Sequence, residues 1–412
     1  MRDGSGAREV VVRDLLWQNI VLEPAAARVV DTPAFQRLRY VRQLGHAFLV
    51  YPGATHTRFE HVLGAYGLAQ RALAGLQRRG ALDGFDERDA LRIRLGALLH
   101  DIGHYPFSHA LEESGFTSHE AIGEQLLGEG ALAEALVEAG FDDSARAFGA
   151  LIRGASDDPL AGLISGSIDV DKIDYLKRDA TMCGVPYGVV DVDRLLACLT
   201  VVELDGRRRI GMLEKGAAAL ESLLFAKYQM YRNVYWHHAV RSATAMFKRL
   251  VHEAVVDRVL DPATLVAATD DWLMRDLEQQ DRTGLALALH ERALFKRALE
   301  LLPTELPTPL APWVRDDRAR LARAEDALAR RVGLGPAELL IDVPFKEAML
   351  GLDLPILRRD GSVERLTQRG WPGRMDLPPI ADTLAESARR VRVFTRRPAA
   401  VTPDHLADAL GG

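Results

Sequence analysis

The sequence predicts an all-α helical core followed by a smaller α+β region at the C-terminal end. Apolar residues recur at helical spacing through most of the first 300 residues. Four prolines then fall between Leu302 and Pro312, in a stretch that cannot continue a helix. A strand-like run and a hairpin signal come after it. We therefore expect a core over residues 1–300 and an α+β region over residues 301–412.

Composition and charge exclude several classes of protein. The 412 residues can bury a large core, and the hydrophobic fraction of 48% is ordinary for a globular chain. A net charge of -6 argues against binding nucleic acid through a broad basic surface. The two cysteines provide neither a disulfide framework nor a thiolate metal cluster. Residues 1–12 lack an apolar leader and no run reaches the roughly 18–20 apolar residues of a membrane span, so we expect a cytoplasmic protein without membrane contact.

The first elements are weakly patterned. Residues 9–22 mix valines with scattered apolar residues, which predicts a short strand or turn leading into helix. A helix is expected to start at Asp31-Thr32-Pro33, with Asp31 as its cap and Pro33 in its first turn. Before Gly45 ends it, this helix would turn four apolar residues inward, namely Phe35, Leu38, Val41 and Leu44.

A helix from about Thr57 places His61 on its buried face. Gly64 and Ala65 share that face and leave room for a close neighbour. We expect this neighbour to be the helix that begins at Asp86.

The helix from Asp86 leads into residues 98–109, which concentrate three histidines and a carboxylate. Its apolar stripe ends at His100 and Asp101, so both side chains point into the protein. A buried carboxylate needs a proton, an ion pair or a metal. Taken alone, the pair is explained more simply as a core histidine beside a capping aspartate, whereas a bound cation requires partners elsewhere in the chain.

The segments that follow contain candidate partners for His100 and Asp101. Pro106 breaks the helix and turns His104 and His109 toward a common space, and a new helix opens at Ser118-His119-Glu120. In the helix over residues 166–183, Asp171, Tyr175 and Asp179 repeat every fourth residue and share one face.

One histidine, a His-Asp pair and an aspartate from three helices would together offer two imidazoles and two carboxylates. Such a set suits one divalent ion per subunit, which can be Mn, Fe, Zn, Ni or Mg, with geometry choosing among them.

The remaining chain is helical to about residue 260 and then mixed. Between residues 214 and 260, Tyr228, Tyr231 and Tyr235 form a stripe that is either core or part of a binding surface. Beyond the prolines we expect an Arg/Asp-rich solvated helix over 314–333, a strand over 339–343, a hairpin at 359–361, a last helix over 380–392 and a loose tail. The basic run at Arg389, Arg390, Arg392, Arg396 and Arg397 is interpreted as a solvated face or a subunit contact.

Several of these segments, in this order, resemble one family. The chain is similar to the HD-domain phosphohydrolases, and within them to the deoxynucleoside triphosphate triphosphohydrolases, in the bacterial form without a SAM domain. The motifs that carry the resemblance are residues 31–39, 43–45, 51–54, 58–61, 100–104, 106–109 and 168–172. The resemblance implies an all-α HD-domain core.

The resemblance also implies roles for individual residues. The metal ligands would be His61, His100, Asp101 and Asp171. The catalytic residues around the scissile phosphate would be His104, His109 and His119, with Glu112 orienting His119 where the mammalian relative has aspartate. The substrate contacts would be Gln43, Leu44, Arg58, Lys172, Tyr175, Asp179, Lys227, Tyr231 and Tyr235. Because Lys227 replaces an arginine of that relative, and Tyr231 and Trp236 replace polar residues, base and sugar preference are expected to differ.

A regulatory site is a further expectation from the resemblance. Asp31, Gln36 and Arg39 match positions that in the mammalian relative read an activating guanine nucleotide at a subunit interface. The residues themselves are explained equally well as a helix cap and an exposed helix edge. If the regulatory interpretation holds, the protein is a homo-oligomer, a dimer or tetramer, and its basic run contributes phosphate contacts.

The expected function is metal-dependent hydrolysis of a deoxynucleoside triphosphate at the α-phosphorus, which yields deoxynucleoside and tripolyphosphate. Two alternatives stay open. One is another HD-type phosphohydrolase activity, on nucleoside monophosphates or phosphodiesters. The other is a non-catalytic nucleotide sensor, which the presence of every expected ligand and proton-transfer histidine disfavours.

Overall fold

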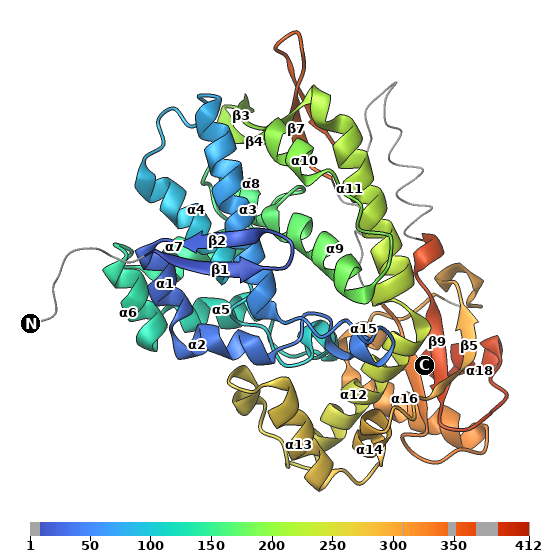
Figure 1. Ribbon diagram of the computed structural model, residues 1–412. Coiled ribbons are helices and arrows are strands. Elements are labelled where there is room, and N and C mark those ends of the chain that lie inside the picture. The colour runs from blue at the N-terminus through green and yellow to red at the C-terminus, as the bar shows by residue number, and fades with distance from the viewer. Residues whose placement is uncertain (1–8, 308, 345–351, 368–385, 412) are drawn as a thin grey trace, which may run out of the picture.

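The computed structural model describes residues 9–307, 309–344, 352–367 and 386–411. Helices build the larger part, and one of the two sheets of the C-terminal region lies at one end together with α16 (Arg318–Arg331) and α18 (Pro403–Leu410) (Figure 1). The helices of the first part are α1 (Pro24–Val30), α2 (Pro33–Gln36), α3 (Arg58–Arg78), α4 (Glu87–Leu99), α5 (His119–Leu127), α6 (Gly130–Glu138), α7 (Ser144–Ile152), α8 (Gly162–Ser165), α9 (Val170–Cys183), α10 (Val192–Cys198), α11 (Ala217–Met230), α12 (His238–Val256), α13 (Asp270–Gln280) and α14 (Leu285–His290). None of the helices in the described ranges is long and apolar enough to cross a membrane.

The expected helical core is confirmed, but it is not all-α. Residues 9–22 form an antiparallel hairpin of β1 (Val10–Asp14) and β2 (Gln18–Leu22). A second hairpin joins β3 (Leu199–Leu204) to β4 (Arg207–Leu213). Its turn residues Asp205 and Gly206 have φ angles of 55° and 71°, the left-handed pair that an Asp-Gly hairpin turn requires. This turn signal was present in the sequence and was missed.

The prediction of a single helix from Asp31 to Gly45 is wrong. One turn of α2 passes into a 3-10 turn, η1 (Arg37–Tyr40), and the chain then extends at Val41. Asp31 does not cap α2: it ends α1, and Thr32 is the residue whose side chain accepts from the amide of Phe35. The helix stops because backbone groups find partners elsewhere, since the Val41 carbonyl accepts from the Arg58 amide.

Two of the three helices that surround the site, α3 and α4, begin where the sequence places them, whereas α9 begins at Val170, four residues after the expected start at residue 166. A capping box at Thr57 and Glu60 starts α3, Asp86 caps α4, and Asp169 caps α9. Helix α4 ends at Leu99, so Pro106 does not break it as expected. Helices α3 and α9 approach so closely that a Cβ added to Gly64 would lie 2.0 Å from an oxygen of Asp174.

The predicted helical run over 214–260 is interrupted. Helix α11 ends at Met230, a π turn, η6 (Tyr231–Tyr235), follows it, and α12 begins at His238. A helical stretch of this kind widens the turn and is frequent at functional sites. Here it places Tyr231 and Tyr235 beside each other, with ring centroids 5.0 Å apart.

The strands of the C-terminal region belong to two different sheets. The predicted strand is confirmed as β6 (Leu339–Asp342), and the predicted hairpin as β7 (Leu354–Leu357) and β8 (Val363–Leu366). The sheets have the orders β3-β4-β7-β8 and β5-β9-β6, with β5 (Lys296–Leu301) and β9 (Val391–Thr395). The β7-β8 hairpin therefore lies beside β3 and β4, far from the other C-terminal strands (Figure 1). The division of the chain at residue 300 stays a prediction.

The expected last helix over 380–392 is present only in part, and the expected loose tail is wrong. Residues 380–385 fall outside the described part and residues 386–388 are helical, but Val391 and Arg392 belong to β9 and not to a helix. The tail is not loose, because α18 packs Leu406 and Leu410 against α16. The Arg/Asp-rich helix is α15 (Trp313–Asp316) together with α16, and α16 is only partly solvated because it buries one apolar face.

The basic run is likewise not one solvated face. Arg392 is buried and donates to Glu300 at 2.7 Å. All five residues of β9 are buried, and the carboxylate paired with Arg392 offsets the cost of burying its charge.

Candidate active site and metal centre

Four side chains from three helices converge at the base of a cavity, and we call them the metal face: His61, His100, Asp101 and Asp171. His61 lies in α3, Asp171 in α9, and the His100-Asp101 pair directly follows α4. The Nε2 atom of His61 lies 3.2 Å from Nε2 of His100 and 3.1 Å from an oxygen of Asp171. An oxygen of Asp101 lies 3.5 Å from Nε2 of His100. The four residues predicted as ligands are thus brought together.

The chemistry of these donors fits a divalent cation. His100 directs Nδ1 at the carbonyl of Ala97 at 2.9 Å, and His61 directs Nδ1 at Asp174 at 2.8 Å. When each Nδ1 carries its proton, two Nε2 lone pairs face each other with no hydrogen between them, an arrangement that a bound cation satisfies. Burial lowers the pKa of His61, but hydrogen bonds to Asp171 and Asp174 outweigh this and raise the pKa to about 10. The site therefore attracts positive charge.

Asp174, which sequence reasoning did not single out, anchors the metal face from behind. Its side chain is fully buried and accepts from His61, from Trp17 Nε1 at 2.5 Å and twice from Arg178. Arg178 also donates to Asp14 at the end of β1. The signal that could have revealed Asp174 is its place one helical turn beyond Asp171, on the side that faces α3.

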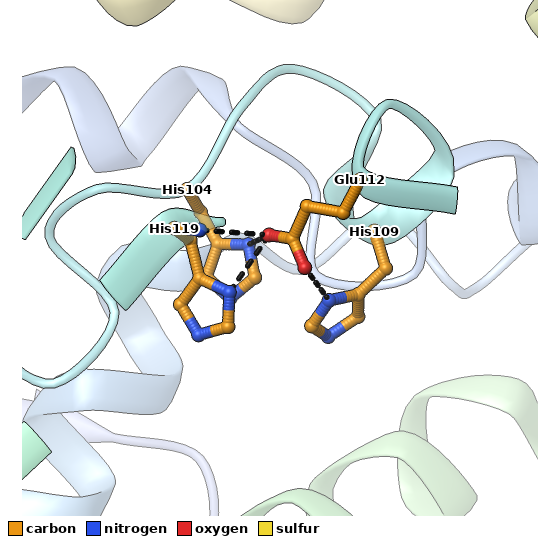
Figure 2. Close-up of side chains that lie close together, drawn as sticks. All are labelled: His104, His109, Glu112 and His119. Atoms are coloured by element: carbon orange, nitrogen blue, oxygen red, sulfur yellow. Dashed lines mark hydrogen bonds and ion pairs between the residues drawn. The ribbon is translucent and has the colours of Figure 1, made fainter. Parts of the chain in front are cut away.

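A second group of side chains lies beside the metal face, and we call it the histidine–glutamate group: His104, His109, Glu112 and His119. Figure 2 shows the carboxylate of Glu112 between the rings. Glu112 pairs with Nδ1 of His119 at 2.7 Å and with Nδ1 of His109 at 3.2 Å. The rings of His104 and His119 stack with centroids 3.8 Å apart. The expected pairing of His119 with Glu112 is present in the structure.

Charge in this group is unevenly distributed. Burial lowers the pKa of His119, but Glu112 more than compensates, so the pKa of His119 is raised. Burial, with Arg58 and His119 nearby, holds the pKa of His104 well below its usual range. His104 is therefore neutral and its Nε2 lies 3.1 Å from Asp101, whereas His119 is able to carry a proton near neutral pH.

The cavity above both groups has a volume of about 1060 Å³. Most of the predicted substrate contacts line it: Gln43, Leu44, Arg58, Lys172, Tyr175, Asp179, Tyr231, Tyr235 and Trp236. Lys227 is buried in α11 and is not among its lining residues in the described part of the chain.

Several lining residues are already fixed by partners. Tyr235 donates to Asp179 at 2.6 Å, and His56, a residue not predicted for the site, pairs with the other oxygen of Asp179 at 2.8 Å. Arg58 pairs with Asp101 at 2.5 Å, and Lys172 with Asp169 at 2.5 Å.

The candidate regulatory residues lie away from this cavity. Asp31 is exposed at the end of α1. Gln36 donates to the carbonyl of Val30, and Arg39 donates to Gln36 at 2.8 Å while it covers the ring of Phe59. Gln36 and Arg39 thus pair at an exposed edge, and their regulatory role stays a prediction.

Comparison with known proteins identifies the class. The profile described as "HD domain" matches residues 58–179, and the one described as "HD associated region" matches residues 190–369. An uncharacterised protein of Methanocaldococcus jannaschii is 35% identical over 92% of this chain and 77% of its own length. The chain belongs to the HD-domain phosphohydrolase family.

Named relatives and solved structures agree with this assignment. The deoxynucleoside triphosphate triphosphohydrolases of Bos taurus and Homo sapiens are each 30% identical over 76% of this chain, which spans 57% and 53% of their lengths. A crystal structure of a hypothetical protein from Aquifex aeolicus superposes with a TM-score of 0.73 at 26% identity and covers 98% of this chain and 99% of that one. A phosphohydrolase from Bacteroides thetaiotaomicron shares the fold, with a TM-score of 0.74 at 21% identity over 95% of this chain and all of that one.

Proposed function

We propose that the protein hydrolyses deoxynucleoside triphosphates at the α-phosphorus and releases deoxynucleoside and tripolyphosphate. The observation that carries this proposal is that one cavity of about 1060 Å³ is lined by the histidine–glutamate group and by three members of the metal face, His100, Asp101 and Asp171. Tyr175 and Tyr235 line the same cavity. It can thus hold a whole nucleotide against both groups. The bovine and human relatives, which are deoxynucleoside triphosphate triphosphohydrolases, support the same reaction.

The residues of the metal face would hold one divalent ion. Such an ion supplies Lewis-acid polarisation of a phosphoryl oxygen and lowers the pKa of bound water. Arg58 orients Asp101 and neutralises charge on the substrate at the same time, because its guanidinium has donors on two edges.

Proton transfer to the leaving 5′-oxygen falls to the histidine–glutamate group. His119 carries the proton, and Glu112 fixes its ring through Nδ1, which leaves Nε2 as the donating atom. His104 is neutral and accepts no share of that proton while it stacks on His119.

A second candidate is a nucleoside monophosphate phosphatase of the same family. One observation favours it: Arg58 and Lys172 are each paired with a carboxylate, which reduces the positive charge offered to a triphosphate. The two reactions differ in product, because the monophosphatase releases orthophosphate. A phosphodiesterase would release a nucleotide, and a non-catalytic sensor would release nothing.

The test is incubation with individual ribo- and deoxyribonucleotides and Mn²⁺, followed by anion-exchange separation. The proposal expects tripolyphosphate and deoxynucleoside in equal amounts. Orthophosphate or a nucleotide as the first product would contradict it, and no turnover of any nucleotide would favour the sensor.

Nucleotide activation is the second part of the proposal. A carboxylate at Asp31 accepts from the N1 and amino groups of guanine, and Arg39 stacks or pairs with phosphate, so the exposed edge with Gln36 is chemically competent. A ligand that prefers the assembled form shifts the protein toward a dimer or tetramer. We expect GTP to raise both mass by light scattering and activity, and Asp31→Ala and Arg39→Ala to prevent both. An unchanged mass and rate in the unmodified protein would reject activation.

A further inference from the structure

The segment that carries the catalytic side chains has little regular structure of its own. Residues 101–109, here called the catalytic loop, run from a metal ligand through His104 to His109. Phe107 in this loop has a φ of 58°, a left-handed conformation that a bulky residue rarely adopts. A loop in this state keeps its shape only when contacts from outside fix it.

Arg37, at the start of η1, supplies one such contact. Its Nη2 donates to the carbonyls of Ile102 at 3.1 Å and His104 at 2.8 Å, and its Nη1 donates to the carbonyl of Ala268 at 3.0 Å. All three of these bonds reach backbone oxygens. The Arg37 side chain is partly buried, and this burial lowers its pKa to about 10.

Asp270, the first residue of α13, holds the other half of the loop. It is 1% exposed, and one carboxylate oxygen accepts from the amide of Phe107 at 2.9 Å. The other oxygen accepts from the amide of Arg42 at 3.0 Å and from its guanidinium at 3.3 Å. Burial raises the pKa of Asp270 to about 6, and these bonds partly offset the shift.

Arg37 and Asp270 come from two chain segments that contact each other. Arg37 and Arg42 come from residues 37–42, Ala268 and Asp270 from residues 268–270, and each segment contacts the other as well as the loop. On its inner side the same loop presents His104 to Asp101 and to His119. Displacement of the His104 backbone would therefore move its ring relative to both neighbours.

We propose that Arg37 and Asp270 are positioning residues that hold the catalytic loop from behind and thereby align His104 and His109 for the reaction. The effect on catalysis rests on the proposed function, whereas the holding of the loop does not. Neither residue lines the cavity among the described residues, so both act through the loop and not on the substrate.

The test compares Arg37→Lys and Asp270→Asn with the unmodified metal-loaded protein. Lysine keeps the charge but cannot reach three carbonyls in a fork, and asparagine cannot accept from Arg42 with its nitrogen. We expect kcat to fall about 10- to 100-fold, because a small misplacement of catalytic groups has effects of this size. We expect KM to change less than about twofold and metal content to stay at one ion per subunit.

Hydrogen exchange followed by mass spectrometry gives a readout independent of activity. Amides of residues 101–109 should exchange about tenfold faster in both variants, while those of α3 stay unchanged. The matched control is Arg79→Lys. The guanidinium of Arg79 also donates to a backbone carbonyl, that of Leu199, but away from the cavity. This control should leave kcat and the exchange of residues 101–109 unaltered.

A kcat equal to that of the unmodified protein, or a rise in KM alone, would overturn the inference. A uniform increase of exchange in α3 and in the loop would also overturn it, because the two residues would then serve only general stability. If the unmodified protein hydrolyses no nucleotide, the proposed function fails, and loop-specific exchange alone decides whether Arg37 and Asp270 hold the loop.

Discussion

The metal face and the histidine–glutamate group share a cavity but are built differently. The metal face sits on α3, α9 and the end of α4, and Asp174 behind it accepts four hydrogen bonds from His61, Trp17 and Arg178. The histidine–glutamate group sits on a loop, on 3-10 turns and at the start of α5, and Glu112 links His109 to His119 through two hydrogen bonds.

This difference suits the metal face to hold its side chains rigidly and the histidine–glutamate group to adjust the pKa of a proton donor. A cation site needs donors at fixed separations, and buried helices with several charged partners provide them. A proton donor needs a ring whose pKa its neighbours tune, and Glu112 is the largest of the three carboxylate contributions that raise the pKa of His119, ahead of Asp101 and Glu120. Changes in the metal face should therefore remove the ion and the activity together, whereas changes in the histidine–glutamate group should alter the pH dependence and leave the ion in place.

The largest effect is expected from Asp101→Ala. This change removes a proposed ligand that also pairs with Arg58, so it breaks a buried charge pair beside the site. Metal content and activity should disappear together. Elemental analysis that finds full metal occupancy in this variant would refute the assignment of the metal face.

The next effect is expected from Glu112→Gln. With Glu112 gone, the pKa of His119 loses the interaction that raises it and falls. A general acid is active below its pKa, so the alkaline limb of the kcat/KM profile should move to lower pH, and kcat should fall about 10²-fold. Metal content should be unchanged. A profile identical to that of the unmodified protein would exclude His119 as the general acid.

A smaller effect is expected from Asp174→Asn, which weakens the support of His61 but removes no ligand. Loss of such outer partners typically lowers metal affinity about 10- to 100-fold. A metal titration with a competing chelator measures it. Asp193→Asn, on an exposed ion pair with Arg71, is the control and should leave the affinity unchanged.

The smallest effect is expected from Tyr235→Ala. Tyr235 lines the cavity but belongs neither to the metal face nor to the histidine–glutamate group. Tyr235, held by Asp179, and Leu44 would crowd a ribose 2′-hydroxyl, so the unmodified protein should prefer deoxyribonucleotides. The variant should reduce this preference about tenfold, as expected for a steric contact of moderate size. Equal kcat/KM for ribo- and deoxyribonucleotides in the unmodified protein would contradict the role of Tyr235.

The same contrast decides what the sequence could predict. The proposed ligands His61 and Asp171 lie on regular helices, where periodicity alone predicts a buried face for His61 and a face shared with Tyr175 and Asp179 for Asp171. The course of residues 31–45 could not be predicted, because tertiary bonds such as the one from Arg58 to the Val41 carbonyl override local helix signals. The roles of Asp174 and Asp270 could not be predicted for a similar reason, because the role of a buried carboxylate depends on partners that are distant in sequence.

The site of attack is the central claim, and hydrolysis of a deoxynucleoside triphosphate in ¹⁸O-labelled water tests it most directly. Attack at the α-phosphorus with loss of the 5′-oxygen places one label in tripolyphosphate and none in the deoxynucleoside. Mass spectrometry of the separated products should show this distribution. Label in orthophosphate, in pyrophosphate or in a nucleotide would contradict the account, because the bond that breaks would then lie farther along the phosphate chain.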